Sequence, residues 1–243
     1  MRTIILAAGK GQRIFESLKK NKCLLNINDE TLIKKIIKDS KKNNINKITV
    51  VTGFKEENIK KHLQNEDVNF LNNKHYNKRE MLYSIILALK KYHKENILIS
   101  YSDILFHNNI FKKISKLSNK NKIILPINMN WKNVWKIRKK KITLDCETLT
   151  YDNNNNLTQI GRKISTFKDV QGQFMGLLYI PKSKNKFFIK VYKNMDKKIS
   201  NKIHLTSFLD KLIGTKQKIK CLKTYSQWYE FDDMEDYKNF LKK

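Results

Sequence analysis

A short apolar run near the N-terminus ends abruptly in a loop that contains two glycines. Residues 4–8 read Ile-Ile-Leu-Ala-Ala and lead into Gly9, Lys10 and Gly11, with Arg13 two positions later. The run predicts a buried strand, and the glycines predict a tight loop after it. Glycine lets backbone N–H groups point at an anion, and the two basic side chains add positive charge at the same place. The stretch therefore predicts a strand followed by a phosphate-binding loop.

Two common phosphate motifs do not fit this loop. The position three after Gly11 is Ile14, so the glycine spacing of the dinucleotide-binding fingerprint is absent. No Gly-Lys-Ser/Thr follows, which excludes a Walker A loop. Taken alone, the two glycines are equally compatible with an ordinary tight loop.

The composition bounds the classes of protein that this chain can represent. Its 243 residues suit one large α/β domain or at most two small ones, and we expect one domain that spans residues 1–243. A net charge of +29 ordinarily indicates nucleic acid or an anionic membrane as partner, but the lysines are scattered, so a biased composition is the favoured explanation. Cys23, Cys146 and Cys221 form no Cys-x-x-Cys pair, which indicates reduced thiols without structural zinc. No apolar run reaches signal-peptide or membrane-spanning length, and we expect a soluble cytoplasmic protein.

Beyond the loop, the periodicity alternates between helix and strand. Helical spacing of apolar residues predicts helices in residues 31–40 and 80–89 and a helical pair in 194–214. Apolar and β-branched runs predict strands at residues 47–53, 68–71, 96–103, 122–127 and 171–180. Asp152 and four asparagines separate residues 142–151 from 157–161, which predicts a β-hairpin. This order indicates a Rossmann-like, doubly wound, mostly parallel α/β sheet with a hairpin insertion.

One predicted strand ends in a carboxylate. Asp103 follows residues 96–102, and in open parallel sheets ligands bind beyond the carboxyl ends of the strands. Mg²⁺ takes oxygen ligands, often one or two carboxylates together with substrate phosphates. Asp103 is therefore a candidate metal ligand, and the alternative is a helix N-cap or a loop turn.

Acidic residues gather near the C-terminus of this basic chain, where five of residues 230–236 are Asp or Glu. If residues 228–232 form a strand, Glu230 and Asp232 share one face. Two carboxylates side by side are costly unless a cation lies between them. A solvated edge strand is the alternative for this pair. The acids that follow Asp232 are expected to begin the last helix.

Several of these segments together resemble the signature of nucleotidyltransferases that activate sugars and phosphorylated alcohols. The resemblance rests, in matching order, on residues 6–13, on Asn21-Lys22-Cys23-Leu24-Leu25, on Asp103 and on residues 228–232. It covers nearly the whole chain, although Asn21 stands where the family usually has proline. It implies a loop that holds the triphosphate of an NTP, with Mg²⁺ on Asp103, Glu230 and Asp232. The implied catalytic residues are Lys22, Arg13 and Asp103, and the implied nucleotide-binding residues are Leu6, Ala7, Ala8, Gly9, Lys10, Gly11 and Ser84.

Ser84 matches the serine of the family's Asn-Asn-x-x-Ser pattern beside the nucleotide base, whereas the asparagines are replaced here. Its alternative role is that of a small residue that lets a helix pack closely.

The middle of the chain resembles the acceptor-binding part of cytidylyltransferases that act on phosphocholine and related phosphorylated or phosphonylated molecules. The resemblance is carried by Trp131, Arg138, the stretch that begins with Asp145, and residues 160–163. An acceptor phosphate favours a planar, permanently charged donor, so Arg138 is the first candidate and Lys163 the second. The tryptophans at 131 and 135 are equally compatible with a core or a homodimer interface.

The resemblance implies an enzyme that joins CMP from CTP to a small phosphorylated acceptor and releases pyrophosphate. Phosphocholine, 2-aminoethylphosphonate, glycerol phosphate and phosphoglutamine are all open as acceptors, and decoration of capsule or surface polysaccharide is the implied pathway. A sugar-1-phosphate uridylyl- or guanylyltransferase is the second hypothesis. A basic nucleic-acid binder on a degenerate enzyme fold is the hypothesis from a different class of protein.

Overall fold

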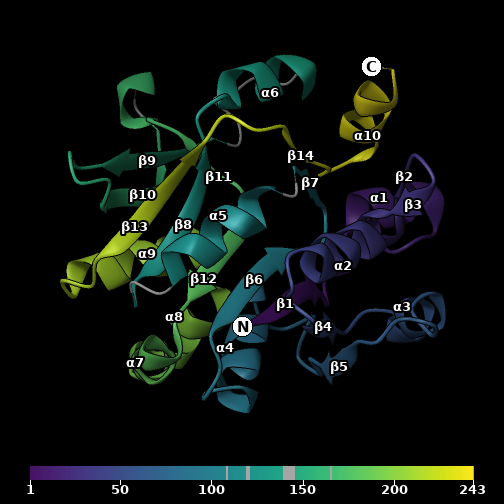
Figure 1. Ribbon diagram of the computed structural model, residues 1–243, viewed down its shortest axis with the longest axis horizontal. Coiled ribbons are helices and arrows are strands. Elements are labelled where there is room, and N and C mark those ends of the chain that lie inside the picture. Colours follow the sequence, from purple (N-terminus) through teal and green to yellow (C-terminus); the bar gives the residue numbers. More distant parts are fainter. Residues whose placement is uncertain (108, 119–120, 139–145, 165, 243) are drawn as a thin grey trace.

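A central sheet of eight strands forms the middle layer of the molecule (Figure 1). The computed structural model describes residues 1–107, 109–118, 121–138, 146–164 and 166–242. In spatial order the strands are β11 (Gln173–Phe174), β8 (Ile123–Asn128), β12 (Leu177–Ile180), β6 (Ile97–Tyr101), β1 (Arg2–Ala7), β4 (Lys47–Thr52) and β5 (Asn69–Asn72), and β13 (Ile219–Thr224) also pairs with β8. Within this sheet only β11 and β12 run antiparallel to their neighbours. The predicted mostly parallel, Rossmann-like sheet is confirmed.

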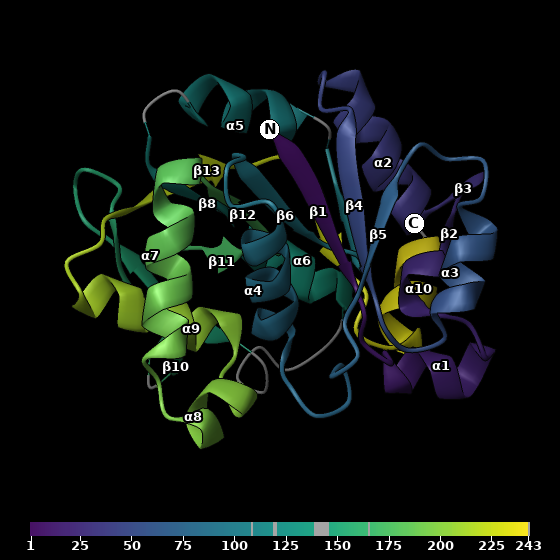
Figure 2. The same ribbon diagram turned by 90° about the horizontal axis from the view of Figure 1, so that it is seen from below.

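Helices cover both faces of the sheet (Figure 2). They are α1 (Gln12–Leu18), α2 (Leu32–Lys42), α3 (Glu56–His62), α4 (Met81–Lys91), α5 (Asn109–Ser118), α6 (Trp131–Arg138), α7 (Lys182–Lys193), α8 (Lys197–Lys202), α9 (Leu205–Gly214) and α10 (Met234–Leu241). Side chains alternate between the two faces of β1, so Ile4 packs in the core under α4, α7 and α9, while Ile5 packs in the core under α2, α3 and α5. No helix in the described part of the chain is both long and apolar enough to cross a membrane.

Most predicted elements are present within one or two residues of their expected bounds. The helices expected at 31–40 and 80–89 are α2 and α4, and the helical pair expected in 194–214 is α8 and α9. The hairpin is confirmed as β9 (Glu147–Tyr151) and β10 (Leu157–Lys163), closed by a turn in which the backbone N–H of Asn156 donates to the Asp152 carboxylate. Residues 142–145 of its first predicted strand lie outside the described residues.

The prediction of one continuous strand at 171–180 is wrong, because residues 175 and 176 interrupt it and separate β11 from β12. Gly176 lies in this break with φ of +73°, a left-handed conformation that does not continue a strand. The Tyr101 ring packs directly against it, and a Cβ at Gly176 would lie 3.0 Å from Tyr101 Cγ. The break therefore makes room for Tyr101 at the end of β6.

A two-stranded ribbon, which the sequence predicted only in part, brings the two acidic regions together. β7 (Ile104–Phe106) pairs antiparallel with β14 (Trp228–Glu230), and Glu230 stands opposite Ile104. The backbone N–H of Phe231 also donates to the Asp103 carbonyl over 3.1 Å. Asp103 precedes β7 and Glu230 ends β14, so the pairing puts both acids at the same end of the ribbon. A strand was expected at 228–232 and ends at Glu230, whereas β7 was not predicted.

Candidate active site

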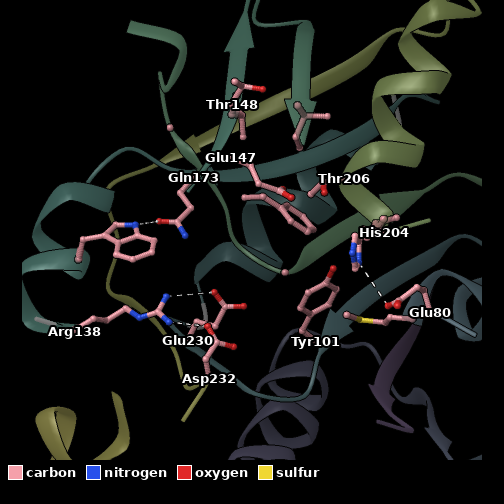
Figure 3. Close-up of a pocket in the computed structure, with 18 of the residues that line it drawn as sticks. Glu80, Tyr101, Arg138, Glu147, Thr148, Gln173, His204, Thr206, Glu230 and Asp232 are labelled. Carbon is pink, nitrogen blue, oxygen red and sulfur yellow. Dashed lines mark hydrogen bonds and ion pairs between the residues drawn. The ribbon is translucent and has the colours of Figure 1, made fainter. Parts of the chain in front are cut away.

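Two adjoining cavities open at the carboxyl ends of β1 and β6. The first, which we call the loop cavity, has a volume of about 270 Å³. Its walls include eight residues that the sequence analysis singled out, namely Leu6, Ala7, Ala8, Gly9, Gly11, Lys22, Ser84 and Asp103. The second, which we call the hairpin cavity, has a volume of about 280 Å³ and is lined by side chains from β9, β10, α6, α9 and β14 (Figure 3). Glu80, Met81 and Tyr101 line both cavities, so the two spaces meet at these residues.

Gly11 shapes the loop at the end of β1. It adopts φ of +55° directly before α1, and a Cβ there would lie 3.0 Å from Lys22 Cβ. A side chain at this position would therefore be strained and would push against Lys22. The predicted tight loop is confirmed, and its binding of an anion stays a prediction.

Asn21 fixes the short 3-10 turn that carries Lys22. Its side-chain amide is buried and donates to the Phe54 carbonyl over 2.9 Å, while the turn itself spans Lys22–Leu24. This bond ties the segment to the chain after β4 at the position where the family usually has proline. Asn21 Oδ1 is buried and has no hydrogen-bond partner within the described part of the chain.

Lys22 joins the two acidic regions. Its Nζ lies 2.7 Å from Asp103 Oδ2 and 3.1 Å from Asp232 Oδ1, although Asp232 is 210 residues away in sequence. Burial lowers the pKa of Lys22, but Asp103 and Asp232 outweigh this effect, and its pKa lies above the ordinary value. Lys22 is therefore charged at neutral pH, and Asp103 and Asp232 lie close together around it.

Arg138 is held on the other side of Asp232. It is buried, and its Nη2 lies 2.6 Å from Asp232 Oδ2 while its Nε lies 2.9 Å from Asp236 Oδ1. Its Nη1 is 3.9 Å from Glu230 Oε2 (Figure 3). Arg138 was predicted from the sequence to donate to an acceptor phosphate. Its guanidinium lines the hairpin cavity but already contacts three carboxylates of the protein.

The two neighbouring carboxylates have opposite pKa shifts. Burial raises the pKa of Asp232, but Lys22 and Arg138 outweigh this effect and lower it to about 2. Burial, together with the charges of Asp232 and Asp103, raises the pKa of Glu230 well above its usual range. The shared cations therefore stabilise Asp232 as an anion and leave Glu230 less well compensated.

The remaining acids of the C-terminal run begin α10, as predicted. Asp233 caps the helix by accepting hydrogen bonds from the backbone N–H groups of residues 235 and 236. Asp236 was expected only to place negative charge at this helix start. Its side chain is instead buried against Arg138 and accepts a hydrogen bond from the Asp232 backbone N–H over 2.9 Å. The sequence carries no local signal for this contact, because the partner is 98 residues away.

Ser84 lies on the wall of the loop cavity and accepts a hydrogen bond from the Asn73 side chain over 2.9 Å. Asn73 also accepts from the His75 backbone N–H and donates its own N–H to the Thr52 carbonyl. Asn73 and Tyr76 line this cavity but were not predicted, because neither stands in a recognisable motif.

The other predicted cations lie at the margin of the site. Arg13 lines the hairpin cavity with an exposed side chain, and its guanidinium is 3.9 Å from Asp233. Lys10 and Lys163 are exposed and are absent from the walls of both cavities. The structure therefore brings Lys22 and Arg13 to the cavities but not Lys163, the second candidate for the acceptor phosphate. Asp145, a further residue of the predicted acceptor region, lies outside the described residues.

The two tryptophans of α6 are core residues. Trp131 and Trp135 are buried within the single chain, and Trp135 Nε1 donates to Gln173 Oε1 over 2.9 Å at the wall of the hairpin cavity (Figure 3). The monomer therefore buries both rings without a partner subunit, and the homodimer stays a prediction.

The carboxylates around Lys22 resemble a metal site only in part. Within the described ranges, no three His, Cys, Asp or Glu side chains already converge as ligands of one metal ion. Lys22 stands between Asp103 and Asp232, and Arg138 stands between Asp232 and Glu230. Asp103 Oδ1 is nevertheless buried without a hydrogen-bond partner among the residues described. The arrangement is a cation-binding cluster of acids, filled by two basic side chains of the protein itself.

Comparison with known proteins agrees with this geometry. Residues 3–141 match the MobA-like NTP transferase domain family. The chain is 28% identical, over 249 aligned positions and 97% of both chains, to the CTP:phosphoglutamine cytidylyltransferase of Campylobacter jejuni subsp. jejuni. Its fold is similar to that of the CTP:phosphocholine cytidylyltransferase LicC from Streptococcus pneumoniae, with a TM-score of 0.76, 17% identity and coverage of 99% and 97% of the two chains.

The fold is also similar to a protein of Bacillus anthracis assigned as a glucose-1-phosphate thymidylyltransferase, with a TM-score of 0.81, 16% identity and coverage of 99% and 94%. At such identities these two structures establish the fold alone. The match to the family spans more than half of the chain and includes the glycine loop, Lys22 and Asp103. The chain therefore belongs to the family of MobA-like NTP transferase domains and is a nucleotidyltransferase.

Proposed function

We propose that this protein transfers CMP from CTP to the phosphate or phosphonate of a small acceptor and releases pyrophosphate. The observation that carries the proposal is the junction of the two cavities. One has a glycine loop and Lys22 on its wall, the other is lined by long polar and aromatic side chains, and they meet at Tyr101 beside Asp103 and Asp232. A nucleotide and an acceptor bound in adjoining cavities would face each other at this junction.

The proposed reaction is an in-line displacement at phosphorus. An acceptor oxygen attacks the α-phosphorus of CTP, the bond from this phosphorus to the bridging oxygen breaks, and pyrophosphate leaves with the electron pair. No protein nucleophile is required, because such chemistry depends mainly on positioning and on neutralising charge. Lys22 is the best-placed cation for the triphosphate, since it lies in the loop cavity next to Gly11. Lys10 lies within the loop and Arg13 follows it, and both would act at its rim.

We propose Mg²⁺ as the cofactor. The donor set suits it, because Asp103, Glu230 and Asp232 offer carboxylate oxygens and Asp103 Oδ1 is buried without a hydrogen-bond partner within the described residues. These three side chains would hold the ion, which would supply charge neutralisation at the phosphates. Lys22 would then exchange its contacts with Asp103 and Asp232 for contacts with the triphosphate.

The hairpin cavity favours an acceptor that carries an ammonium group. Glu147 points into this cavity near Tyr101 (Figure 3), and its carboxylate has no ion pair or hydrogen bond with any described residue. Tyr101 and Phe174 form an edge-to-face aromatic pair on the same wall, with ring centroids 5.7 Å apart. Carboxylates and aromatic faces both attract a cation. Phosphoglutamine, phosphocholine and 2-aminoethylphosphonate carry an ammonium group, whereas glycerol phosphate does not.

A donor and acceptor screen tests the proposal. The purified protein is incubated with Mg²⁺, with each of CTP, UTP, GTP and ATP in turn, and with each of the four acceptors or a sugar 1-phosphate, and pyrophosphate release is measured. We expect turnover with CTP and an ammonium-bearing acceptor. Preference for UTP or GTP with a sugar 1-phosphate would reject the cytidylyl hypothesis in favour of a sugar nucleotidyltransferase. The role in surface polysaccharide decoration rests on the resemblance and is tested by deleting the gene and analysing the polysaccharide.

A further inference from the structure

The C-terminal helix contacts the active site through one buried side chain. Asp236, in the first turn of α10, is almost completely buried, with 1% of its side chain exposed. Both of its oxygens bind Arg138, at 2.9 Å to Nε and 3.0 Å to Nη2. Asp236 Oδ2 also accepts the backbone N–H of Asp232. One carboxylate therefore fixes both a guanidinium and the backbone of a predicted metal ligand.

Arg138 is oriented from several sides. The bidentate contact with Asp236 sets the plane of its guanidinium, and Trp135 packs against it with 4.8 Å from Arg138 Cζ to the ring centroid. The Asn239 side chain of α10 donates to the Arg138 backbone carbonyl. Asp236 holds the Nε and Nη2 atoms of the guanidinium. In this orientation Nη2 also lies 2.6 Å from Asp232, and Nη1 faces Glu230.

We propose that Arg138 and Asp236 are a positioning pair that fixes the carboxylates of Asp232 and Glu230 for the nucleotide-bound divalent cation, an inference that rests on the proposed function. The pair touches neither nucleotide nor cation. It acts through Asp232, whose side chain is held by Arg138 and whose backbone is held by Asp236. This assigns to Arg138 a role different from binding the acceptor phosphate.

The conservative variants Asp236→Asn and Arg138→Lys test the pair. Asparagine has one acceptor oxygen instead of two, and lysine has no fork, so each variant loosens the bidentate contact while filling the same space. We expect kcat to fall by about 10- to 100-fold, as for groups that orient metal ligands, while KM for the acceptor changes by less than about threefold. We also expect a higher Mg²⁺ concentration at half-maximal rate.

Arg2 provides a matched control elsewhere in the molecule. It is also a buried arginine, it contacts the Glu95 carboxylate through Nε and Nη2, and its Cζ lies 4.0 Å from the Tyr92 ring centroid. Arg2→Lys should lower thermal stability to a similar extent and leave kcat and the Mg²⁺ requirement unchanged. If Arg2→Lys lowers kcat as much as Arg138→Lys, the effect is one of general stability and the proposal is wrong.

A binding measurement separates this inference from the proposed activity. The affinity of Mn²⁺ for the protein with a non-hydrolysable CTP analogue is measured by electron paramagnetic resonance, which requires no turnover. We expect the affinity to fall by about 10-fold or more in Asp236→Asn, and in Arg138→Lys if the first variant does not fold. Equal affinities in variant and wild type overturn the positioning role, as does an absence of Mn²⁺ binding in the wild type. A clear difference without catalytic turnover would support the pair and reject the proposed reaction.

Discussion

The loop cavity and the hairpin cavity adjoin, yet different kinds of residue line them. One part of the loop cavity's wall is a stretch of mostly small residues between Leu6 and Gly11, and at Gly9 and Gly11 only backbone atoms can line it; we call this stretch the backbone wall. The hairpin cavity is lined by long side chains from segments spread between Arg13 and Asp232. A backbone wall tolerates few substitutions, whereas a wall of side chains changes with each residue. We infer that the first cavity fixes the reaction and that the second sets the choice of acceptor.

The largest effect is expected at the junction of the cavities, because both substrates depend on it. Asp103→Asn removes the charge of a proposed cation ligand, and we predict a loss of turnover of more than about 100-fold, measured by pyrophosphate release. A nucleic-acid binder would instead keep its salt-dependent affinity in this variant. Turnover close to that of the wild type would show that the junction is not the reaction centre.

A smaller effect, on the binding of CTP alone, is expected when a residue of the loop cavity's backbone wall is changed. Gly11→Ala places a methyl group at φ of +55° and 3.0 Å from Lys22 Cβ. An alanine in this conformation costs roughly 1–2 kcal/mol, and we predict that KM for CTP rises about 10-fold while KM for the acceptor stays constant. Gly214→Ala is the control, since a methyl group there meets no atom of the described residues within 4 Å apart from its own helix and chain neighbours. An equal rise in both KM values would contradict the division of labour between the cavities.

The opposite pattern is predicted for the side-chain wall. Glu147→Gln removes a negative charge of the hairpin cavity that no described residue neutralises, and KM for an ammonium-bearing acceptor should rise about 5- to 10-fold with KM for CTP unchanged. Glycerol phosphate, which is neutral at this end, should bind both proteins equally. Glu57→Gln is the control, because Glu57 is an exposed glutamate of α3 that lines neither cavity, and it should leave every KM unchanged. If Glu147→Gln leaves every acceptor KM unchanged, the acceptor is not recognised through an ammonium group.

Lys163 offers a test with almost no expected effect. It is exposed near the end of β10 and lines neither cavity, so we predict that Lys163→Ala changes kcat and both KM values by less than about twofold. Steady-state kinetics with CTP and each acceptor check this. A large rise in acceptor KM would mean that the hairpin moves toward the acceptor on binding.

The thiols should be inert in both regions. Burial raises the pKa of Cys23, beside Lys22, to about 12 and that of Cys146, beside Glu147, to about 11. At pH 8 a thiol with pKa 11 is about 0.1% thiolate, so we predict negligible reaction of the native protein with a chromogenic disulfide reagent over minutes. The unfolded protein should react at all three cysteines. Fast reaction of one thiol in the native state would indicate that its cavity opens.

Parts of the site that lie close together in the sequence could be predicted from it, whereas parts that depend on distant contacts could not. The strand and the glycine loop are local, since residues 4–13 contain both the apolar run and the glycines that end it. The meeting of Asp103 with Asp232 was inferred only through the resemblance, because the three residues of β7 carry no recognisable strand pattern. The break at Gly176 was missed because it depends on the Tyr101 ring, which comes from another strand.

The role of Arg138 shows the same limit of local reasoning. An exposed arginine and a buried one have the same letter in the sequence, and only the position of Asp236 decides whether the guanidinium meets a ligand or the protein's own acids. The acidic run near the C-terminus was recognised from composition, but the burial of Asp236 against Arg138 was not. Residues that act through distant partners therefore require the folded structure.

The ribbon of β7 and β14 has a consequence for how the protein matures during translation. It joins Asp103 to a segment more than 120 residues later, because Glu230 stands opposite Ile104. While the ribosome is still elongating the chain before residue 228, the glycine loop has been made but its acidic counterpart has not. Until Glu230 and Asp232 have been made, we expect a nascent chain to lack two of the three acids proposed to hold the cation and therefore to be unable to turn over a nucleotide.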